Sequence, residues 1–333
     1  MASSSNHSIT IDIIKGLAII LVVIGHFIPE NSPYWYVKMR EIIYTFHMPT
    51  FLFASGYIFM KYYKNDSLKS FYAKKFNRLI IPYLTTSVIV ISIKILTEKF
   101  LSVDNPVTAL SYLKIFYIPE AGYFLWYIWS LFSIFLIIPF FNTSKKRFAL
   151  LIFSLIIPHI PIDWTNIFSI RQTILMIQYF AIGIFIAENH HIRQKLKSNP
   201  AVLITPLIFA FILGFIYSNC NIVQLAFICK STIPYLGIYI VSLLALIIQQ
   251  YCIKATQSLV FLSSCSFIIY LLHTTFEGFT KALFNKLSIY SNDNLQFCII
   301  AITVILTGLI MPIICQKMII EKSRILKTLF GLK

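Results

Sequence analysis

The sequence predicts an all-α, polytopic integral membrane protein with about ten transmembrane helices. Of its 333 residues, 58% are hydrophobic and only 12% are charged, about half the charged fraction of a typical soluble domain. The first apolar run, 11–29 (IDIIKGLAIILVVIGHFIP), has the length of about 20 residues that a bilayer-spanning helix needs. Neither a basic region before this run nor a small-residue cleavage site after it indicates a signal peptide, so we expect a retained first helix.

Ten apolar segments predict the membrane spans. They are 11–29, 42–60, 80–97, 123–141, 148–160, 172–187, 201–217, 232–250, 258–276 and 295–316. The fifth is short and ends at Pro158 and Pro161, which indicates a broken or partly spanning helix. No segment between spans exceeds about 25 residues, so we expect a single transmembrane domain over 1–333 without a separate soluble domain.

The distribution of Lys and Arg residues predicts the orientation. Loops on one side of the predicted membrane hold 18 of the 28 basic residues, whereas eight lie near the opposite ends of the spans. By the positive-inside rule, both termini are expected to be cytoplasmic. This pattern accounts for most of the net charge of +16 without nucleic acid, and no loop resembles a nucleic-acid-binding module.

Three histidines on separate spans are candidate functional residues. The predicted topology places His26, His47 and His273 at roughly one depth, toward the outer face. Histidine is suited to proton transfer because its unperturbed pKa is near 6.5. Structural roles are also open at this point: His26 precedes a Pro-containing loop, and His47 lies beside Pro49, where a kink frees backbone groups.

Two further ionisable groups lie in or near the spans. Lys15 lies eleven residues before His26, roughly 16 Å along a helix axis and toward the cytoplasmic face. An ionisable group in hydrocarbon is a candidate functional residue, but Lys15 is also placed to reach the interface while pairing with Asp12. Glu277 follows His273 and is placed either to orient it or to lie at the interface.

A basic segment, KSFYAKKFNRLIIPY, leads into the third span. Its Lys74, Lys75 and Arg78 form a candidate site for a phosphorylated cytoplasmic ligand, because Arg binds phosphate in bidentate fashion and Lys acts as a point charge. The alternative is a basic amphipathic stretch that lies on anionic membrane lipid.

Several segments together resemble the membrane-bound acyltransferase family 3, and its fucose 4-O-acetyltransferase-like branch in particular. In the first helix, Lys15 precedes His26 by ten intervening positions, which is the spacing of that family's opening motif. The later segments follow in the family's order: FHMPTFLFASGY, KKFNRLIIP, FLWYIWSLF, QYFAIGIF and CSFIIYLLH.

The resemblance implies transfer of an acyl group, usually acetyl, from cytoplasmic acetyl-CoA as co-substrate. The acceptor is a hydroxyl of a surface or lipid-linked glycan of the O-antigen, capsule or exopolysaccharide type, and the enzyme is a multi-pass protein of the bacterial cytoplasmic (inner) membrane. Carried over by residue, Lys15 and His26 are the motif pair, and Lys74, Lys75 and Arg78 are the donor-side cluster. The family often has Arg where this chain has these three lysines, so Arg78 is the best candidate for a bidentate phosphate contact.

We expect His26 to act as general base or as acyl relay, with His47 or His273 stabilising the oxyanion.

Two other functional classes stay open: a polysaccharide transporter or flippase, which normally shows inverted repeats, and an export-linked protein or one that transfers succinyl. A disulfide between Cys220 and Cys229 is possible in an outward loop, and no metal-ligand spacing is present. The sequence leaves the oligomeric state open.

Overall fold

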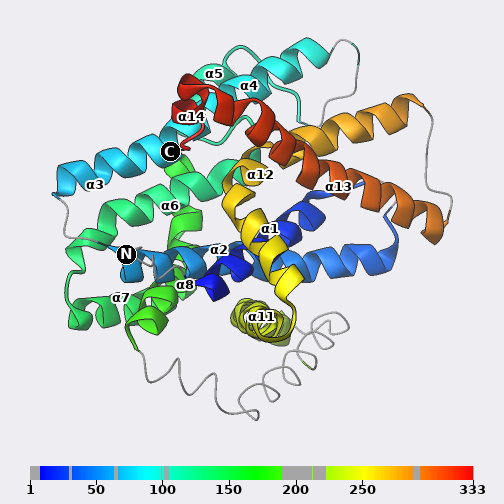
Figure 1. The fold of residues 1–333 in the computed structure, drawn as a ribbon. Helices are drawn as coiled ribbons and strands as arrows, with labels where there is room; N and C mark the ends of the chain where they lie inside the picture. The colour runs from blue at the N-terminus through cyan, green and yellow to red at the C-terminus, as the bar shows by residue number, and fades with distance from the viewer. Residues whose placement is uncertain are drawn as a thin grey trace, which may run out of the picture.

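The computed structural model describes residues 8–29, 32–63, 67–98, 100, 105–189, 212, 223–287 and 293–332, with only the backbone of 223–230. All regular elements in these ranges are helices (Figure 1). Eight of the described helices are long and apolar enough to cross a membrane. The prediction of an all-α, multi-pass membrane protein is therefore confirmed.

The first part of the chain forms helices as far as residue 188. They are α1 (Ile9–His26), α2 (Tyr34–Tyr62), α3 (Leu68–Lys75), η1 (Phe76–Ile80), α4 (Ile81–Thr97), α5 (Ser111–Lys114), η2 (Tyr123–Leu125), α6 (Trp126–Ile137), η3 (Ile138–Phe140), α7 (Ser144–Ile156), η4 (Ile157–His159), η5 (Ile167–Ser169) and α8 (Ile170–Glu188). The second part contains α11 (Val223–Tyr251), α12 (Ile253–Lys286), α13 (Asn294–Met318), η6 (Ile320–Lys322) and α14 (Arg324–Leu329).

Eight of the ten predicted spans correspond to the eight long apolar helices. The fifth predicted span forms the 13-residue α7, which ends at Ile156 and continues only as the short η4 at Pro158. Such a helix is shorter than the roughly 20 residues that a full crossing needs. The seventh, 201–217, and the proposed Cys220–Cys229 pair lie outside the described residues and side chains. The total of ten spans and the cytoplasmic side of the termini stay predictions.

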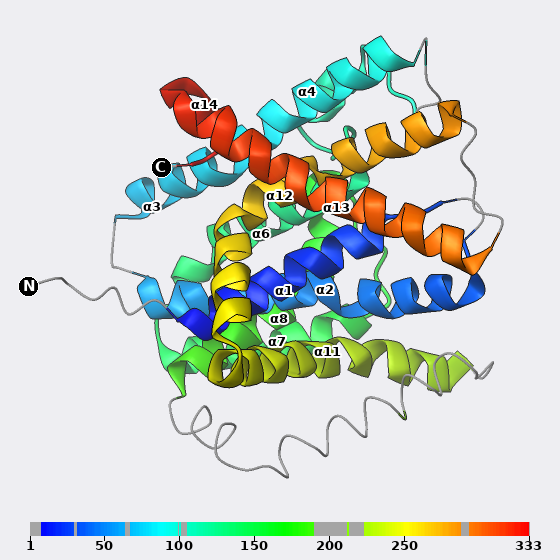
Figure 2. The ribbon, with the colours of Figure 1, turned by 45° about the vertical axis from the view of Figure 1, so that its right-hand side comes forward.

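Helix α1 lies at the centre of the bundle (Figure 2), where it packs against α2, α11, α12 and α13. Its apolar side chains are buried on several faces; Ile13, Ala18 and Val22 have no exposed surface. A helix that is apolar on all sides is expected in such a central position. At Gly16 a Cβ atom would lie 2.4 Å from the Leu259 carbonyl oxygen, so α12 packs directly on the backbone of α1.

Helices α2 and α8 also pack backbone to backbone. A Cβ atom at Gly56 would lie 2.0 Å from the Phe180 carbonyl oxygen, and one at Gly183 would lie 2.1 Å from the Phe53 carbonyl oxygen. Small residues allow membrane helices to pack this closely. Close packing matters because burial of apolar surface contributes little to helix association in lipid. The two reciprocal glycines therefore set the separation of α2 and α8.

Candidate active site

The structure brings the three candidate histidines together from three helices. His26 is the last residue of α1, His47 lies on α2 and His273 lies on α12. The centroid of the His26 ring is 4.9 Å from that of His273 and 6.2 Å from that of His47. His47 and His273 are buried, whereas His26 is partly accessible. His26 is thus the member of the cluster that a ligand can reach most directly.

Tyr36 on α2 holds the turn that carries His26. Its hydroxyl donates hydrogen bonds to the backbone oxygens of Ile24 (2.9 Å) and Phe27 (3.2 Å). The last carbonyls of a helix lack partners within the helix, so the buried Tyr36 satisfies them where α1 ends. Phe27 and Phe297 pack against the Tyr36 ring with centroid distances of 5.9 and 5.0 Å. The position of His26 is therefore fixed by packing on both sides of the helix end.

Backbone hydrogen bonds fix the tautomer of all three histidines. The Nδ1 atoms of His26 and His47 each lie 2.8 Å from a carbonyl oxygen, of Val22 and Ile43 respectively. Nδ1 of His273 lies 3.0 and 2.9 Å from the carbonyls of Ile269 and Tyr270. Because a carbonyl only accepts, Nδ1 carries the hydrogen and the neutral ring has its lone pair on Nε2. Each neutral ring is therefore a potential base at Nε2.

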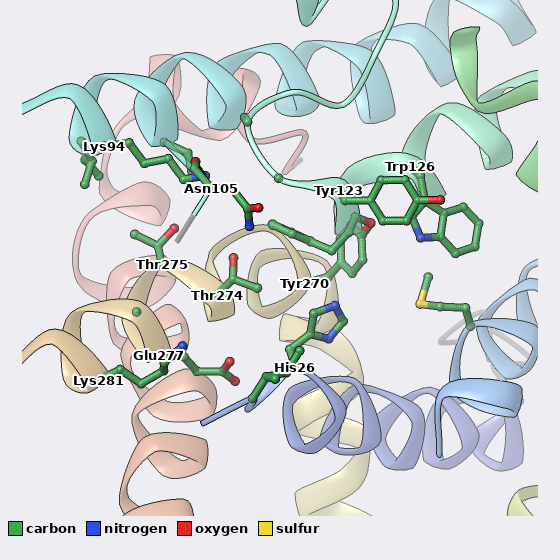
Figure 3. A pocket seen from close by; sticks show the side chains of 18 of the residues that line it. His26, Lys94, Asn105, Tyr123, Trp126, Tyr270, Thr274, Thr275, Glu277 and Lys281 are labelled. Atoms are coloured by element: carbon green, nitrogen blue, oxygen red, sulfur yellow. Dashed lines mark hydrogen bonds between the residues drawn. The ribbon is translucent and has the colours of Figure 1, made fainter. Parts of the chain in front are cut away.

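The His26 ring borders a cavity of about 810 Å³ (Figure 3). This volume falls in the range of about 300–1,000 Å³ that is usual for small-molecule sites. Its aromatic lining comes from Tyr44 on α2, from Tyr270 on α12 and from the segment that begins α6. The aromatic residues of that segment are Tyr123, Phe124 and Trp126. Aromatic rings beside polar groups form a surface on which a sugar ring can stack.

The cavity also contains charged side chains from three helices. Lys94 on α4, Arg171 on α8, and Glu277 and Lys281 on α12 all line it. Sequence reasoning placed Glu277 near His273 but missed the three cations as site residues. Arg171 and Lys281 belong to the few basic residues at the opposite ends of the spans. Lys94 is an ionisable residue inside the predicted third span, which marks it as a candidate functional residue. Which helices share a cavity depends on lateral packing, which hydropathy does not record.

The donor-side residues lie apart from this cavity. Lys15, Lys74, Lys75 and Arg78 are all absent from its lining. Lys74 and Arg78 are exposed, whereas Nζ of Lys75 lies 3.7 Å from the centroid of the Phe135 ring. Arg78 lies in the π-helical turn η1, in which the Ile81 N–H donates to the Phe76 carbonyl. Such turns are rare and are frequently found at functional sites.

Lys15 connects the buried part of α1 to this basic segment. Its ammonium group lies within electrostatic range of both Asp12 and Arg78. Asp12 is buried and accepts a hydrogen bond of 3.2 Å from the Ser263 hydroxyl of α12. Lys15 is thus close enough to Asp12 for electrostatic attraction, which agrees with a structural role for Lys15. The structure also places Lys15 on the same side of the bundle as Arg78.

In the described part of the chain, no group of three or more His, Cys, Asp or Glu side chains is arranged to hold a metal ion.

Eight long apolar helices, six of which line a cavity bordered by His26 and His47, define a multi-pass membrane protein with an internal candidate active site. The sequence profile of the acyltransferase domain family matches residues 8–312. The chain therefore belongs to this acyltransferase family, and the resemblance indicated by its motifs is confirmed.

Two curated relatives are both described as nodulation protein NolL. The chain is 40% identical to that of Sinorhizobium fredii over 62 residues, which is 17% of this chain and 17% of the relative. It is 25% identical to that of Mesorhizobium japonicum over 158 residues, which is 44% of this chain and 39% of the relative. The alignments thus span well under half the length of these relatives. No solved structure matches the chain.

Proposed function

We propose that the protein transfers an acetyl group from cytoplasmic acetyl-CoA to a sugar hydroxyl of a surface or lipid-linked glycan. The observation that carries the proposal is the His26 imidazole, which borders the cavity with its Nε2 lone pair available, in a chain of an acyltransferase family. The multi-pass architecture supports a location in the bacterial cytoplasmic membrane, with the donor on one side and the acceptor on the other.

In the proposed reaction, His26 Nε2 removes the proton of the sugar hydroxyl while its oxygen attacks the thioester carbonyl carbon. A base is needed because the pKa of a sugar hydroxyl lies far above neutral pH. The tetrahedral intermediate then breaks its C–S bond, and the CoA thiolate leaves and takes up the proton from His26. The products are the sugar ester and CoA.

The oxyanion of this intermediate requires a hydrogen-bond donor. With Nδ1 bonded to backbone oxygens, His47 and His273 can donate from Nε2 only when the ring carries a second proton. Both rings are buried beside His26, which disfavours a resident imidazolium, so we propose that one of them takes up this proton only as the oxyanion forms. A covalent relay is the alternative: His26 Nε2 attacks the thioester and the CoA thiolate leaves. The sugar hydroxyl then takes the acetyl group from His26 and gives up its proton to the thiolate.

On the donor side, we propose that Arg78 and Lys74 bind phosphate groups of acetyl-CoA at the exposed start of the third membrane helix. Lys75, which lies against the Phe135 ring, and Lys15, which lies near Arg78, add positive charge to the same region. The pantetheine arm would extend from there between the helices toward His26, over a distance comparable to the roughly 16 Å that separate Lys15 from His26 on α1.

Replacing Lys74, Lys75 and Arg78 together with alanine should raise the KM for acetyl-CoA by about ten-fold or more, because charged hydrogen bonds to phosphate are lost. The KM for the glycan should change little. The matched control is alanine at the exposed Lys145 and Lys146 of α7, which removes cationic charge elsewhere on the predicted cytoplasmic side. An unchanged KM for acetyl-CoA combined with lost glycan binding would assign the basic segment to the other substrate.

Mass spectrometry of the cell-surface glycan, with and without the gene, tests the function itself. The proposal predicts that deletion removes one acetyl group per repeat and leaves the glycan chain otherwise intact. Loss of the entire glycan would indicate a transporter or flippase, and loss of a group of different mass, such as succinyl, would indicate another acyl donor.

A further inference from the structure

Three buried oxygen atoms in the cavity wall have no hydrogen-bond partner among the described residues. They are Oε1 of Gln172 on α8, and Oγ1 of Thr275 and Oε1 of Glu277 on α12. Buried polar atoms are paired in the great majority of proteins, so each such atom calls for an explanation. The atoms of Gln172 and Glu277 are amide and carboxyl oxygens, which accept hydrogen bonds. The cavity is therefore complementary to a ligand that brings several donors.

Glu277 is the most informative of these residues. It is 3% exposed, it lies one helical turn after His273, and its carboxyl group is directed toward the side of the cavity where His26 lies (Figure 3). Tyr36 and Tyr44 lie within electrostatic range of it, which places it beside the end of α1. Lys281, one further turn along α12, lies within electrostatic range of the Glu277 carboxyl group.

The surrounding helices leave room for this side chain. At Gly308 of α13 a Cβ atom would lie 2.7 Å from Glu277 Oε1 and 2.8 Å from its Cγ. A larger residue at 308 would thus displace the carboxyl group. Placing an ionisable group at membrane depth costs free energy. Its presence therefore indicates a function that an apolar side chain would not supply.

Gln172 presents a second oriented acceptor on α8. Its Nε2 donates a hydrogen bond of 2.6 Å to the Tyr123 hydroxyl, which turns the Oε1 atom away from Tyr123. This hydrogen bond anchors the amide group of Gln172 in the cavity wall, with its other polar atom unpaired among the described residues. Unpaired polar atoms on α8 and α12, in a cavity that aromatic rings also line, suit a polyol better than the thioester arm of CoA, which brings few donors.

We propose that Glu277 recognises the acceptor sugar: its carboxyl oxygen accepts a hydrogen bond from a hydroxyl close to the one that His26 activates. The proposal rests on the proposed function and adds its acceptor subsite. Glu277 would then govern which sugar, and which hydroxyl of that sugar, enters the site. A site built to bind a hydroxyl discriminates strongly against a sugar that lacks it, because its acceptor is left unpaired.

The test is steady-state kinetics of the purified full-length protein in lipid, with acetyl-CoA and the unacylated glycan from a strain that lacks the gene. Glu277→Gln keeps the shape of the side chain but replaces one carboxyl oxygen with an amide NH₂ group that only donates. It should raise the KM for the glycan by about ten-fold, because a hydroxyl of the sugar loses its acceptor. The KM for acetyl-CoA should stay unchanged. Glu277→Asp, which withdraws the carboxyl group by one methylene, should raise the glycan KM in the same direction.

The control is Glu41→Gln, which removes an exposed carboxyl group on α2 that pairs with Lys38 at 3.1 Å and lies outside the cavity lining. It should leave both KM values unchanged. An unaltered glycan KM in both folded Glu277 variants, or a fall in kcat alone with a shifted pH profile, would overturn the proposal, because Glu277 would then act only through the histidines or be satisfied by water. Failure of the wild type to acylate this glycan would count against the proposed function instead.

Discussion

Replacing His26 with alanine should lower the rate of acyl transfer by about 100- to 10,000-fold, the usual contribution of a general base. His26 is the partly accessible member of the histidine cluster, and its Nδ1–H is committed to the Val22 carbonyl, so Nε2 is the atom available for proton transfer. The protein should still insert and accumulate, because the helix end is held mainly by Tyr36. Transfer of labelled acetyl to the glycan measures the effect.

The matched control for this variant is His159→Ala, which removes an exposed histidine of η4 outside the cavity. It should keep wild-type activity. A fully active His26→Ala protein would eliminate the proposed mechanism.

Acid quenching of the wild type after exposure to labelled acetyl-CoA alone separates the relay from direct transfer. Label on His26 indicates the relay, whereas no label on His26 together with intact transfer indicates direct attack by the sugar.

Replacing Gly183 with valine should prevent α2 and α8 from packing. Even the first added carbon would lie 2.1 Å from the Phe53 carbonyl oxygen and 2.8 Å from the Tyr57 nitrogen, both backbone atoms that cannot turn aside. Overpacking costs about 1–3 kcal/mol or more, and here the whole helix must move. We expect a lowered Tm and reduced accumulation in the membrane, measured by thermal unfolding in detergent and by quantitative immunoblotting.

Gly278→Ala is the counterpart of this test, because a Cβ atom there would meet nothing within 4 Å. Alanine is favoured over glycine inside a helix by about 0.5–1 kcal/mol. The Tm of the Gly278→Ala protein should therefore be equal to or higher than that of the wild type. Equal stability of the Gly183 and Gly278 variants would show that the close crossing of α2 and α8 does not limit the stability of the fold.

The sequence predicted the membrane helices better than their ends. Hydropathy located the second span at 42–60, but α2 begins at Tyr34, because a helix continues through polar residues such as Lys38 and Glu41 that end the apolar signal. For the same reason α12 extends to Lys286, beyond the predicted end of its span at 276. Hydropathy measures preference for the bilayer, whereas helical structure depends on backbone hydrogen bonds that persist outside it.

The candidate site was predictable in depth but not in lateral arrangement. Topology indicated that His26, His47 and His273 lie at one level, and the structure places their rings within 6.2 Å of the His26 centroid. Topology does not state which helices are neighbours, so Gln172 and Lys94 were not recognised as cavity residues. Likewise, the position of Lys75 against Phe135 of α6 follows from a tertiary contact that its own segment does not contain.

We propose that this one chain carries an acetyl group from CoA to a glycan hydroxyl. The most direct test of this proposal is reconstitution of the purified protein in proteoliposomes, with deuterated acetyl-CoA on the side that bears Arg78 and unacylated glycan on the opposite side. We expect a base-labile deuterated acetyl ester on the glycan, with an equal amount of CoA released. Glycan that stays unlabelled while acetyl-CoA remains intact, or glycan that merely crosses the bilayer, would contradict it.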